Sequence, residues 1–313
     1  MTEPAGELYD LGYVHYEGPR EGRMRARKAV YSNGVRTILG LGRGPLDKAL
    51  PILLFAAAMA PAVVLALVAS QLDDIDVPGH SAYYQIVSII LILFSAMIAP
   101  ELLCPDRRSG VLSLYLVRPL TSTDYVAGRW MAFFSITLLL VYSGQVLLFA
   151  GFVLSAESPL DYMRDNWLDV PRFLGAGLVF ALFATTLALA AAAFTTRRAY
   201  ATAFLVGLFI ISSVAAAALT ECSEGFHESQ PEPEADLEVS CDPVTGRAAK
   251  WLNLIGIVQA PMHINDLIFD RENDGLGLRF MKELPYGVPI SWFALLVAGP
   301  GFALWWRYRR LRA

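Results

Sequence analysis

The sequence predicts an all-α integral membrane protein with about six transmembrane helices. Of its 313 residues, 55% are hydrophobic and 17% are charged, and the mean hydropathy is +0.46. A soluble domain has roughly 45–50% apolar and about 25% charged residues. The apolar residues also form long unbroken runs, without the polar face of a helix on a globular protein. Together with the placement of basic residues between the runs, these observations indicate that the chain crosses a bilayer several times.

Six runs are long enough to cross the hydrocarbon core as helices, which takes about 20 mostly apolar residues. None of them has a charge near its centre. In chain order, the predicted spans are Leu50–Ser70, Tyr83–Cys104, Trp130–Leu154, Phe173–Thr195, Ala201–Leu219 and Val288–Trp306. Aromatic residues near the span ends, including Tyr83, Tyr84 and Trp130, are predicted to anchor the helices at the membrane interface.

The positions of Lys and Arg predict the side of the membrane that each loop faces, because short cytoplasmic loops are enriched in these residues. The segment before the first span, the loop after the second, the turn after the fourth and the end of the chain are basic. The loops after the first and third spans are mainly acidic. We therefore expect both termini on the cytoplasmic side, which requires an even number of spans.

The stretch Trp251–Phe269 is apolar enough to resemble a seventh span, but Asn, Gln, Pro, His and Asp side chains interrupt it. A seventh crossing would also place the Arg-rich end of the chain outside. We predict an interfacial or re-entrant helix here instead. It belongs to an extended outer loop before the last span, residues 220–285, whose first part is acidic.

The predicted organisation is a cytoplasmic arm, residues 1–46, followed by a six-span transmembrane domain, residues 47–313, which includes the outer loop. Within the arm, apolar residues between Arg23 and Arg43 recur near helical spacing among basic ones. This pattern predicts an N-terminal amphipathic helix on the inner leaflet. The alternative is a cytoplasmic helix with a solvated basic face.

Cysteine and histidine residues give no indication of a metal site, because none of the 4 His pairs with a Cys or another His at ligand spacing. Cys222 and Cys241 bracket the acidic part of the outer loop on the oxidising side of the membrane. They form either a disulfide or two free thiols. Cys104, at the cytoplasmic face, is expected to be an inert packing residue.

Catalytic residues are not evident in the spans, which contain weakly polar groups such as Ser143, Gln145, Thr185 and Thr186. These groups suit hydrogen bonds between helices better than hydrolysis. The glycine-rich run 40–44 lacks the Lys-Ser/Thr that completes a phosphate-binding loop. We therefore expect this chain to be no enzyme and to bind no cofactor itself.

The segment between the second and third predicted spans, Glu101–Arg129, has the sequence E-L-L-C-P-D-R-R-S-G-V-L-S-L-Y-L-V-R-P-L-T-S-T-D-Y-V-A-G-R. A glutamate is followed by a charged turn containing glycine, a Leu-rich amphipathic stretch, a proline and a final Gly-Arg. This pattern resembles the permease subunits of ABC-2 type transporters. In that family an acidic residue, a basic Ser-Gly turn, a Leu-rich stretch, a Pro-Leu-Ser/Thr and a Gly-Lys/Arg lie between the second and third helices.

The resemblance covers nearly the whole chain and implies an exporter subunit in the plasma (inner) membrane of a bacterium. Its partners would be ABC ATPase subunits that bind ATP and Mg²⁺, a second permease copy or related chain, and the lipid bilayer; no nucleic acid is expected. It implies a cytoplasmic region that couples the permease to the ATPase. The coupling residues carried over from the family are Glu101, Asp106, Arg107, Arg108, Ser109, Gly110, Arg118, Pro119 and Tyr125.

Three alternatives stay open. The segment could be a plain connecting loop whose arginines only follow the charge rule. The chain could instead be a membrane scaffold or maturation factor that acts on an outer protein partner, which would suit the acidic outer loop. An ATPase-independent membrane transporter or enzyme would be expected to have an ionisable residue at mid-membrane, and the predicted spans lack one.

Overall fold

The computed structural model describes residues 18, 22–42, 44–71, 79–112, 120–220, 247–270 and 284–310, and every regular element in these ranges is helical. The elements are α1 (Arg23–Ile38), α2 (Pro45–Gln71), α3 (His80–Arg108), α5 (Ser122–Ser155), α6 (Pro159–Asp165), α7 (Asp169–Ala193), α8 (Arg198–Thr220), α9 (Arg247–Leu252), the 3₁₀ turn η2 (Asn253–Ile255), α10 (Gln259–Phe269) and α12 (Gly287–Arg310). Six of them, α2, α3, α5, α7, α8 and α12, are long and apolar enough to cross a membrane. The chain is therefore a multi-pass helical membrane protein, as the sequence predicts.

Each predicted span coincides with one of these helices, but several helices extend past the predicted ends. α5 begins at Ser122 rather than Trp130, and α3 continues past Cys104 to Arg108. Hydropathy marks the part of a helix that lies in lipid, whereas its backbone hydrogen bonds can continue into the polar interface. The polar extensions of α3 and α5 meet at one end of the bundle, where the candidate site lies.

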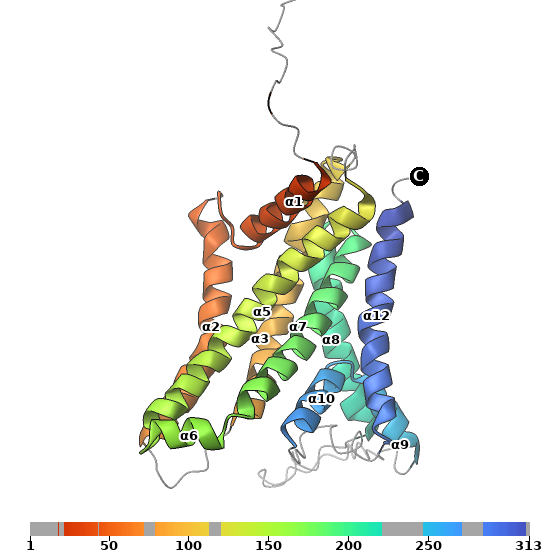
Figure 1. Ribbon diagram of the computed structural model, residues 1–313. Coiled ribbons are helices and arrows are strands. Elements are labelled where there is room, and N and C mark those ends of the chain that lie inside the picture. Colours follow the sequence, from red (N-terminus) through yellow and green to blue (C-terminus); the bar gives the residue numbers. More distant parts are fainter. Residues whose placement is uncertain are drawn as a thin grey trace, which may run out of the picture.

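The six long helices alternate in direction along the chain (Figure 1). α3 and α7 are the most buried of the six, and α2 and α12 are the least buried. α5 crosses the bundle diagonally (Figure 1), because its 34 residues extend about 51 Å and the hydrocarbon core is only about 30 Å thick. It contacts α1, α2, α3, α7 and α12, so it connects most of the molecule.

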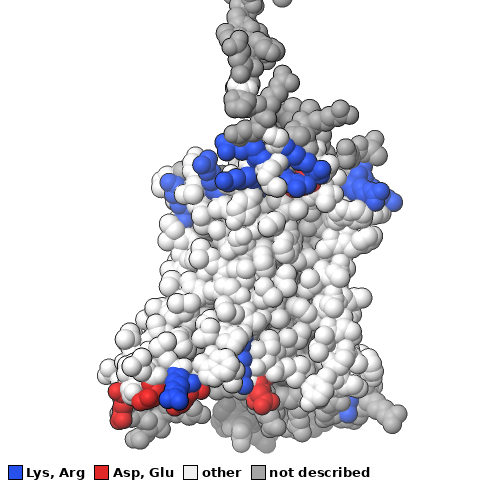
Figure 2. Space-filling view, viewed as in Figure 1, with Lys and Arg blue, Asp and Glu red and all other residues white. Residues whose placement is uncertain are grey.

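The middle of the bundle is free of described charged residues on the face shown in Figure 2, where it is the white band. Large exposed apolar side chains occur on each of the six long helices, for example Ile52, Ile89, Leu139, Leu178, Ile211 and Leu295. A continuous apolar belt of this kind is unfavourable in water and favourable in lipid.

The two ends of the bundle differ in charge. We define the basic end as the end that contains α1, the end of α3, the turn between α7 and α8, and the Arg-rich end of α12 (Figures 1 and 2). The opposite end contains α6, α9 and α10 and is acidic on α6. The first and last described helices thus meet the same end, as an even number of spans requires. The assignment of the basic end to the cytoplasm remains a prediction from the charge rule.

The stretch Trp251–Phe269 forms the end of α9, η2 and α10 rather than one long helix. α10 has 11 residues and is about 16 Å long, too short to cross the membrane. It packs against α3, α7 and α12 at the opposite end, with Gln259 and His263 buried. This agrees with the prediction of an interfacial or re-entrant helix.

The predicted amphipathic helix forms as α1 and ends at Ile38, earlier than expected, before a turn in which Gly40 and Gly42 have φ of 64° and 87°. Its apolar face packs on α5, and Val30 is only 3% exposed. A Cβ at Gly34 would lie 2.7 Å from a side-chain atom of α5, so this glycine allows the close approach. α1 therefore lies across the basic end as part of the bundle.

The prediction that Tyr83 and Tyr84 anchor the second span at the membrane interface is wrong. Their side chains are 0% and 1% exposed, inside the bundle. Tyr83 Oη donates a hydrogen bond to the Ala58 carbonyl oxygen (3.1 Å), and Tyr84 Oη donates one to the Phe173 carbonyl oxygen (2.5 Å). A Cβ at Gly144 would lie 1.7 Å from Tyr83 Oη, so the absence of a side chain there makes room for the tyrosine.

Candidate functional site

The candidate site lies at the basic end, where α5 begins. Thr121 and Asp124 form a capping box: Thr121 Oγ1 accepts a hydrogen bond from the Asp124 backbone N–H (3.3 Å), and Asp124 Oδ2 accepts one from the Thr121 backbone N–H (3.0 Å). These bonds satisfy N–H groups that have no acceptor within the first turn of a helix. They also fix the Asp124 carboxylate at the N-terminus of α5, where the helix dipole favours a negative charge.

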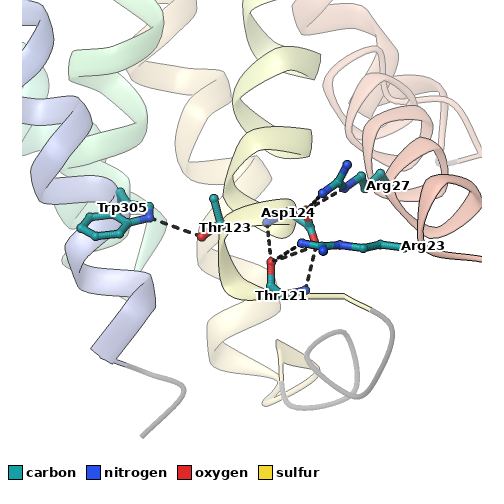
Figure 3. Close-up of polar contacts among 6 residues, drawn as sticks. All are labelled: Arg23, Arg27, Thr121, Thr123, Asp124 and Trp305. Carbon is teal, nitrogen blue, oxygen red and sulfur yellow. Dashed lines mark hydrogen bonds and ion pairs between the residues drawn. The ribbon is translucent and has the colours of Figure 1, made fainter.

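Two arginines of α1 bind the same carboxylate (Figure 3). Arg23 Nε lies 2.7 Å from Asp124 Oδ2, and Arg27 Nε lies 2.7 Å from Asp124 Oδ1. The two arginines are one helical turn apart and therefore share a face of α1. The Asp124 side chain is 5% exposed, whereas those of Arg23 and Arg27 are 49% and 43% exposed. The hydrogen bond to Asp124 raises the pKa of Arg23 above its ordinary value.

α12 contacts the first turn of α5 from the side away from α1 (Figure 3). Trp305 Nε1 donates a hydrogen bond to Thr123 Oγ1 (3.3 Å). The ring centroids of Tyr308 and Tyr125 lie 5.5 Å apart. The start of α5 is thus held between the first and last described helices.

A second carboxylate, Asp106, joins α3 to α5. Its Oδ2 accepts hydrogen bonds from Tyr125 Oη (2.7 Å) and from Arg129 Nη2 (2.6 Å). The side chain of Arg129 is 3% exposed and that of Asp106 is 16% exposed. A charge buried to this degree requires a partner of opposite charge. Asp106 and Arg129 are partners of this kind for each other. Tyr125 is fully buried, so its described role is to support Asp106 inside the chain.

The end of α3 also contacts the turn between α7 and α8. Glu101 forms an ion pair with Arg198 at the start of α8. Arg107 Nη1 donates to the carbonyl oxygens of Ala193 and Thr195, the latter at 3.0 Å. The last carbonyl groups of a helix have no N–H partner in their own helix, so Arg107 completes the hydrogen bonding at the end of α7.

Three of the predicted coupling residues, Arg108, Ser109 and Gly110, are exposed at the tip of α3. Gly110 has φ of 70°, a conformation that favours glycine and turns the chain away from the helix. Within the described part of the chain, Arg108 makes no hydrogen bond or ion pair. Arg118 and Pro119 lie outside the described residues. The tip Arg108–Gly110 is therefore the described part of the predicted region that can contact another protein.

Asp124 and its partners Arg23 and Arg27 were not predicted from the sequence as site residues. The pattern Thr121-x-x-Asp124 could have indicated a capping box, and the spacing of the two arginines could have indicated one helix face. No local pattern shows that these two places meet, because Arg23 and Asp124 are 101 positions apart.

Among the described residues, no group of three or more His, Cys, Asp and Glu side chains could hold a metal ion. Cys104 is a free, buried cysteine, with its Sγ 3.8 Å from the Ala192 carbonyl oxygen. Cys222 and Cys241 lie outside the described residues, so the disulfide stays a prediction.

Neither the models of known protein families nor the curated proteins match this chain. The resemblance to ABC-2 permeases therefore rests on the Glu101–Arg129 segment and on the layout of the helices. At the basic end, ion pairs connect separate helices around one exposed tip.

Proposed function

We propose that this chain is the membrane-spanning permease subunit of an ATP-binding cassette exporter, and that its basic end docks on a separate ATPase subunit. The observation that carries the proposal is the set of ion pairs that joins four elements around the tip of α3. Asp124 joins α1 to α5, Asp106 joins α3 to α5, and Glu101 joins α3 to α8. A displacement of the tip would therefore be transmitted to the helices joined to α3, most firmly to α5 through the buried Asp106–Arg129 pair.

In this mechanism the ATPase holds ATP and Mg²⁺ and contacts the tip Arg108–Gly110. Its closure would displace the tips of two permease copies, since exporters of this family work as pairs. The ion pairs at the basic end would convert that displacement into a rigid-body movement of α3 and α5. The path between the two permeases would then change from inward to outward access. Family resemblance supplies the direction of transport.

The experiment is affinity purification of the tagged protein from native membranes in mild detergent, with identification of copurifying chains and an ATPase assay. Arg108→Glu is the informative variant, because Arg108 is exposed and its reversal breaks no described contact. Arg107 is less suitable, since it donates to carbonyl groups of the α7–α8 turn. Arg36→Glu, an exposed position on α1 at the same end, is the matched control.

We expect a Walker-type ATPase to copurify with the wild type and with Arg36→Glu, and to be lost with Arg108→Glu. If no ATPase appears under conditions that preserve other membrane complexes, the permease proposal is wrong and the six-span fold remains. If an outer protein copurified in place of exported cargo, the result would favour the scaffold or maturation factor.

A second candidate is an ATPase-independent transporter, favoured by polar groups buried where α10 meets α3. Asp266 is 2% exposed and accepts a hydrogen bond from Ser81 Oγ (3.4 Å), and Asn265 Nδ2 donates to Ser81 Oγ (2.9 Å). Ionisable residues buried in membrane proteins often mark ion or substrate pathways. The purified chain alone in liposomes would then dissipate a proton gradient, and Asp266→Asn would abolish this flux.

A further inference from the structure

A cavity of about 880 Å³ opens at the basic end, between the end of α3 and the turn that joins α7 to α8. Cys104, Pro105, Arg108 and Ser109 line it from α3, and residues 196–199 line it from the turn and the start of α8. The residues that bind Asp106 and Asp124 are not among its described lining. The cavity therefore lies beside the ion pairs of Asp106 and Asp124 and shares only Arg198, the partner of Glu101, with the network.

The cavity is positively charged. Arg108, Arg197 and Arg198 line it, and no carboxylate does so among the described residues. Arg198 pairs with Glu101 outside the lining, whereas the Arg197 guanidinium lies 5.6 Å from the centroid of the Tyr200 ring. Of the three guanidinium groups that line the cavity, only that of Arg198 is thus paired with a described carboxylate, that of Glu101. The excess of positive charge favours an anionic ligand, and guanidinium groups suit phosphate oxygens in particular.

The start of α8 adds hydrogen-bond donors to these charges. The first N–H groups of a helix have no acceptor in their own helix, and its N-terminus has a partial positive charge. Arg198 and Ala199, the first residues of α8, are part of the cavity wall. The N-terminus of α8 and the arginine residues thus line the same cavity, a combination that favours phosphate binding.

The surroundings of the cavity are those of a lipid interface. Phe194 and Tyr200, on either side of the α7–α8 turn, are 53% and 61% exposed. Further along the two helices that flank the cavity, Met97 of α3 and Phe204 of α8 are exposed on the apolar surface. Aromatic residues next to charged helix ends are typical of the headgroup region. An occupant would meet cationic groups at one end and apolar side chains directly beyond them.

We propose that this cavity binds the phosphate headgroup of an anionic phospholipid from the leaflet at the basic end. Its acyl chains would lie on the exposed apolar surface of α3 and α8. Basic pockets between transmembrane helices are known to bind anionic headgroups in this way. Lipid binding at this cavity is a property of the isolated chain and does not depend on the docking of an ATPase.

The test is native mass spectrometry of the detergent-purified protein titrated with phosphatidylglycerol or phosphatidylcholine. We expect the wild type to bind phosphatidylglycerol and not phosphatidylcholine. Arg197→Gln should weaken binding about fivefold and Arg108→Gln/Arg197→Gln about 25-fold, the effect expected of removing basic residues next to an anionic lipid. Arg36→Gln, at the same end but outside the cavity, should bind like the wild type.

Arg197→Lys distinguishes loss of charge from misfolding, because it keeps the cation and should retain most of the binding. An unchanged affinity for phosphatidylglycerol in Arg108→Gln/Arg197→Gln would overturn the proposal. If inorganic phosphate competed with phosphatidylglycerol at equal concentration, the site would be one for a free anion and the lipid assignment would be wrong. Copurification of an ATPase with Arg197→Gln would show that lipid binding and docking are separate properties.

Discussion

The two ends of the bundle join their helices by different kinds of polar contact. At the basic end full charges meet across elements, with Asp124 bound by two arginines of α1 and Asp106 bound by Arg129. At the opposite end the contacts are mainly between neutral groups. His80 Nδ1 and Gln145 Oε1 are 2.7 Å apart, and Gln145 Nε2 donates to the His80 carbonyl oxygen (3.0 Å).

For the Asp124 cluster, the difference follows from access to water. The arginines of α1 are about half exposed, so their charges keep most of their hydration while they hold Asp124. The His80 ring instead lies among the rings of Phe149, Phe152 and Phe173, at centroid distances of 6.0, 5.5 and 5.6 Å. An uncompensated charge there would be costly. The basic end therefore joins its helices by ion pairs, whereas the opposite end holds its helices mainly by packing and weaker hydrogen bonds.

The largest effect is expected from Arg129→Met, which removes the buried partner of Asp106 and keeps a similar apolar volume. Removal of one member of a buried ion pair costs about 3–5 kcal/mol. We expect the melting temperature in detergent to fall by about 10 °C, measured by size-exclusion chromatography of a fluorescent fusion after heating.

The control for this change is Arg129→Met combined with Asp106→Leu. It removes both charges, so it should recover most of the lost stability, because no unpaired carboxylate remains. If the double variant melted as low as Arg129→Met, packing rather than the ion pair would explain the loss, and the contrast between the two ends would weaken.

The next effect is local. Asp124→Asn removes the charge that binds Arg23 and Arg27, so α1 should separate from α5 more often. Cleavage in such a segment follows the population of its open form. We expect trypsin to cut between Arg23 and Lys28 about tenfold faster, as two charge-assisted bonds are weakened. Asp161→Asn, on exposed α6 at the opposite end, should leave the rate unchanged.

Quantification of tryptic peptides by mass spectrometry measures both rates. An unchanged rate in Asp124→Asn would show that apolar packing of Val30 and Ile38 alone holds α1 in place.

A smaller effect is expected at the opposite end from Gln145→Leu, which breaks the two hydrogen bonds to His80. Hydrogen bonds between transmembrane helices contribute about 0.6–1.7 kcal/mol. The melting temperature should fall by about 3 °C in the same assay. Ser143→Ala is the matched control, because Ser143 Oγ donates only to the Leu140 carbonyl oxygen of its own helix. A decrease as large as that of Arg129→Met would remove the proposed difference between the ends.

The same residues show how much of the fold could be predicted. The six spans could be found because hydropathy is local in sequence. The interhelical hydrogen bonds expected of Gln145 and Thr186 are confirmed, and Trp130 Nε1 donates to Thr186 Oγ1 (3.1 Å). Ser143 bonds within its own helix instead. For Thr185 the prediction is wrong, because its buried Oγ1 has no hydrogen-bond partner among the described residues. A polar residue in a span thus does not by itself predict an interhelical hydrogen bond, because the partner depends on which faces meet.

The candidate site was predictable to a smaller extent. Glu101, Arg107 and Tyr125 were singled out for contact with a partner protein, and each has a described partner inside this chain. The charge of Glu101 could not reveal this, because Arg198 is 97 positions away. The sequence showed where charges gather, and the tertiary structure decides which of them remain available at the tip.

The smallest effect is expected from Glu101→Gln, which removes the ion pair between α3 and α8. The Arg198 side chain is 50% exposed and that of Glu101 is 25% exposed, so water screens the pair. Exposed pairs of this kind contribute about 0.5 kcal/mol. The melting temperature should change by about 1 °C or less, and at about 1 M salt, where the screening length is about 3 Å, the difference from the wild type should vanish.

A larger decrease that persisted at high salt would mean that this pair is as firm as Asp106–Arg129. α8 would then move together with α3 and α5 when the tip is displaced. With the small effect expected here, α8 is free to keep its position while α3 and α5 move. In the proposed mechanism, α3 would in that case shift relative to α8, because their ion pair is the weakest of the three at the basic end.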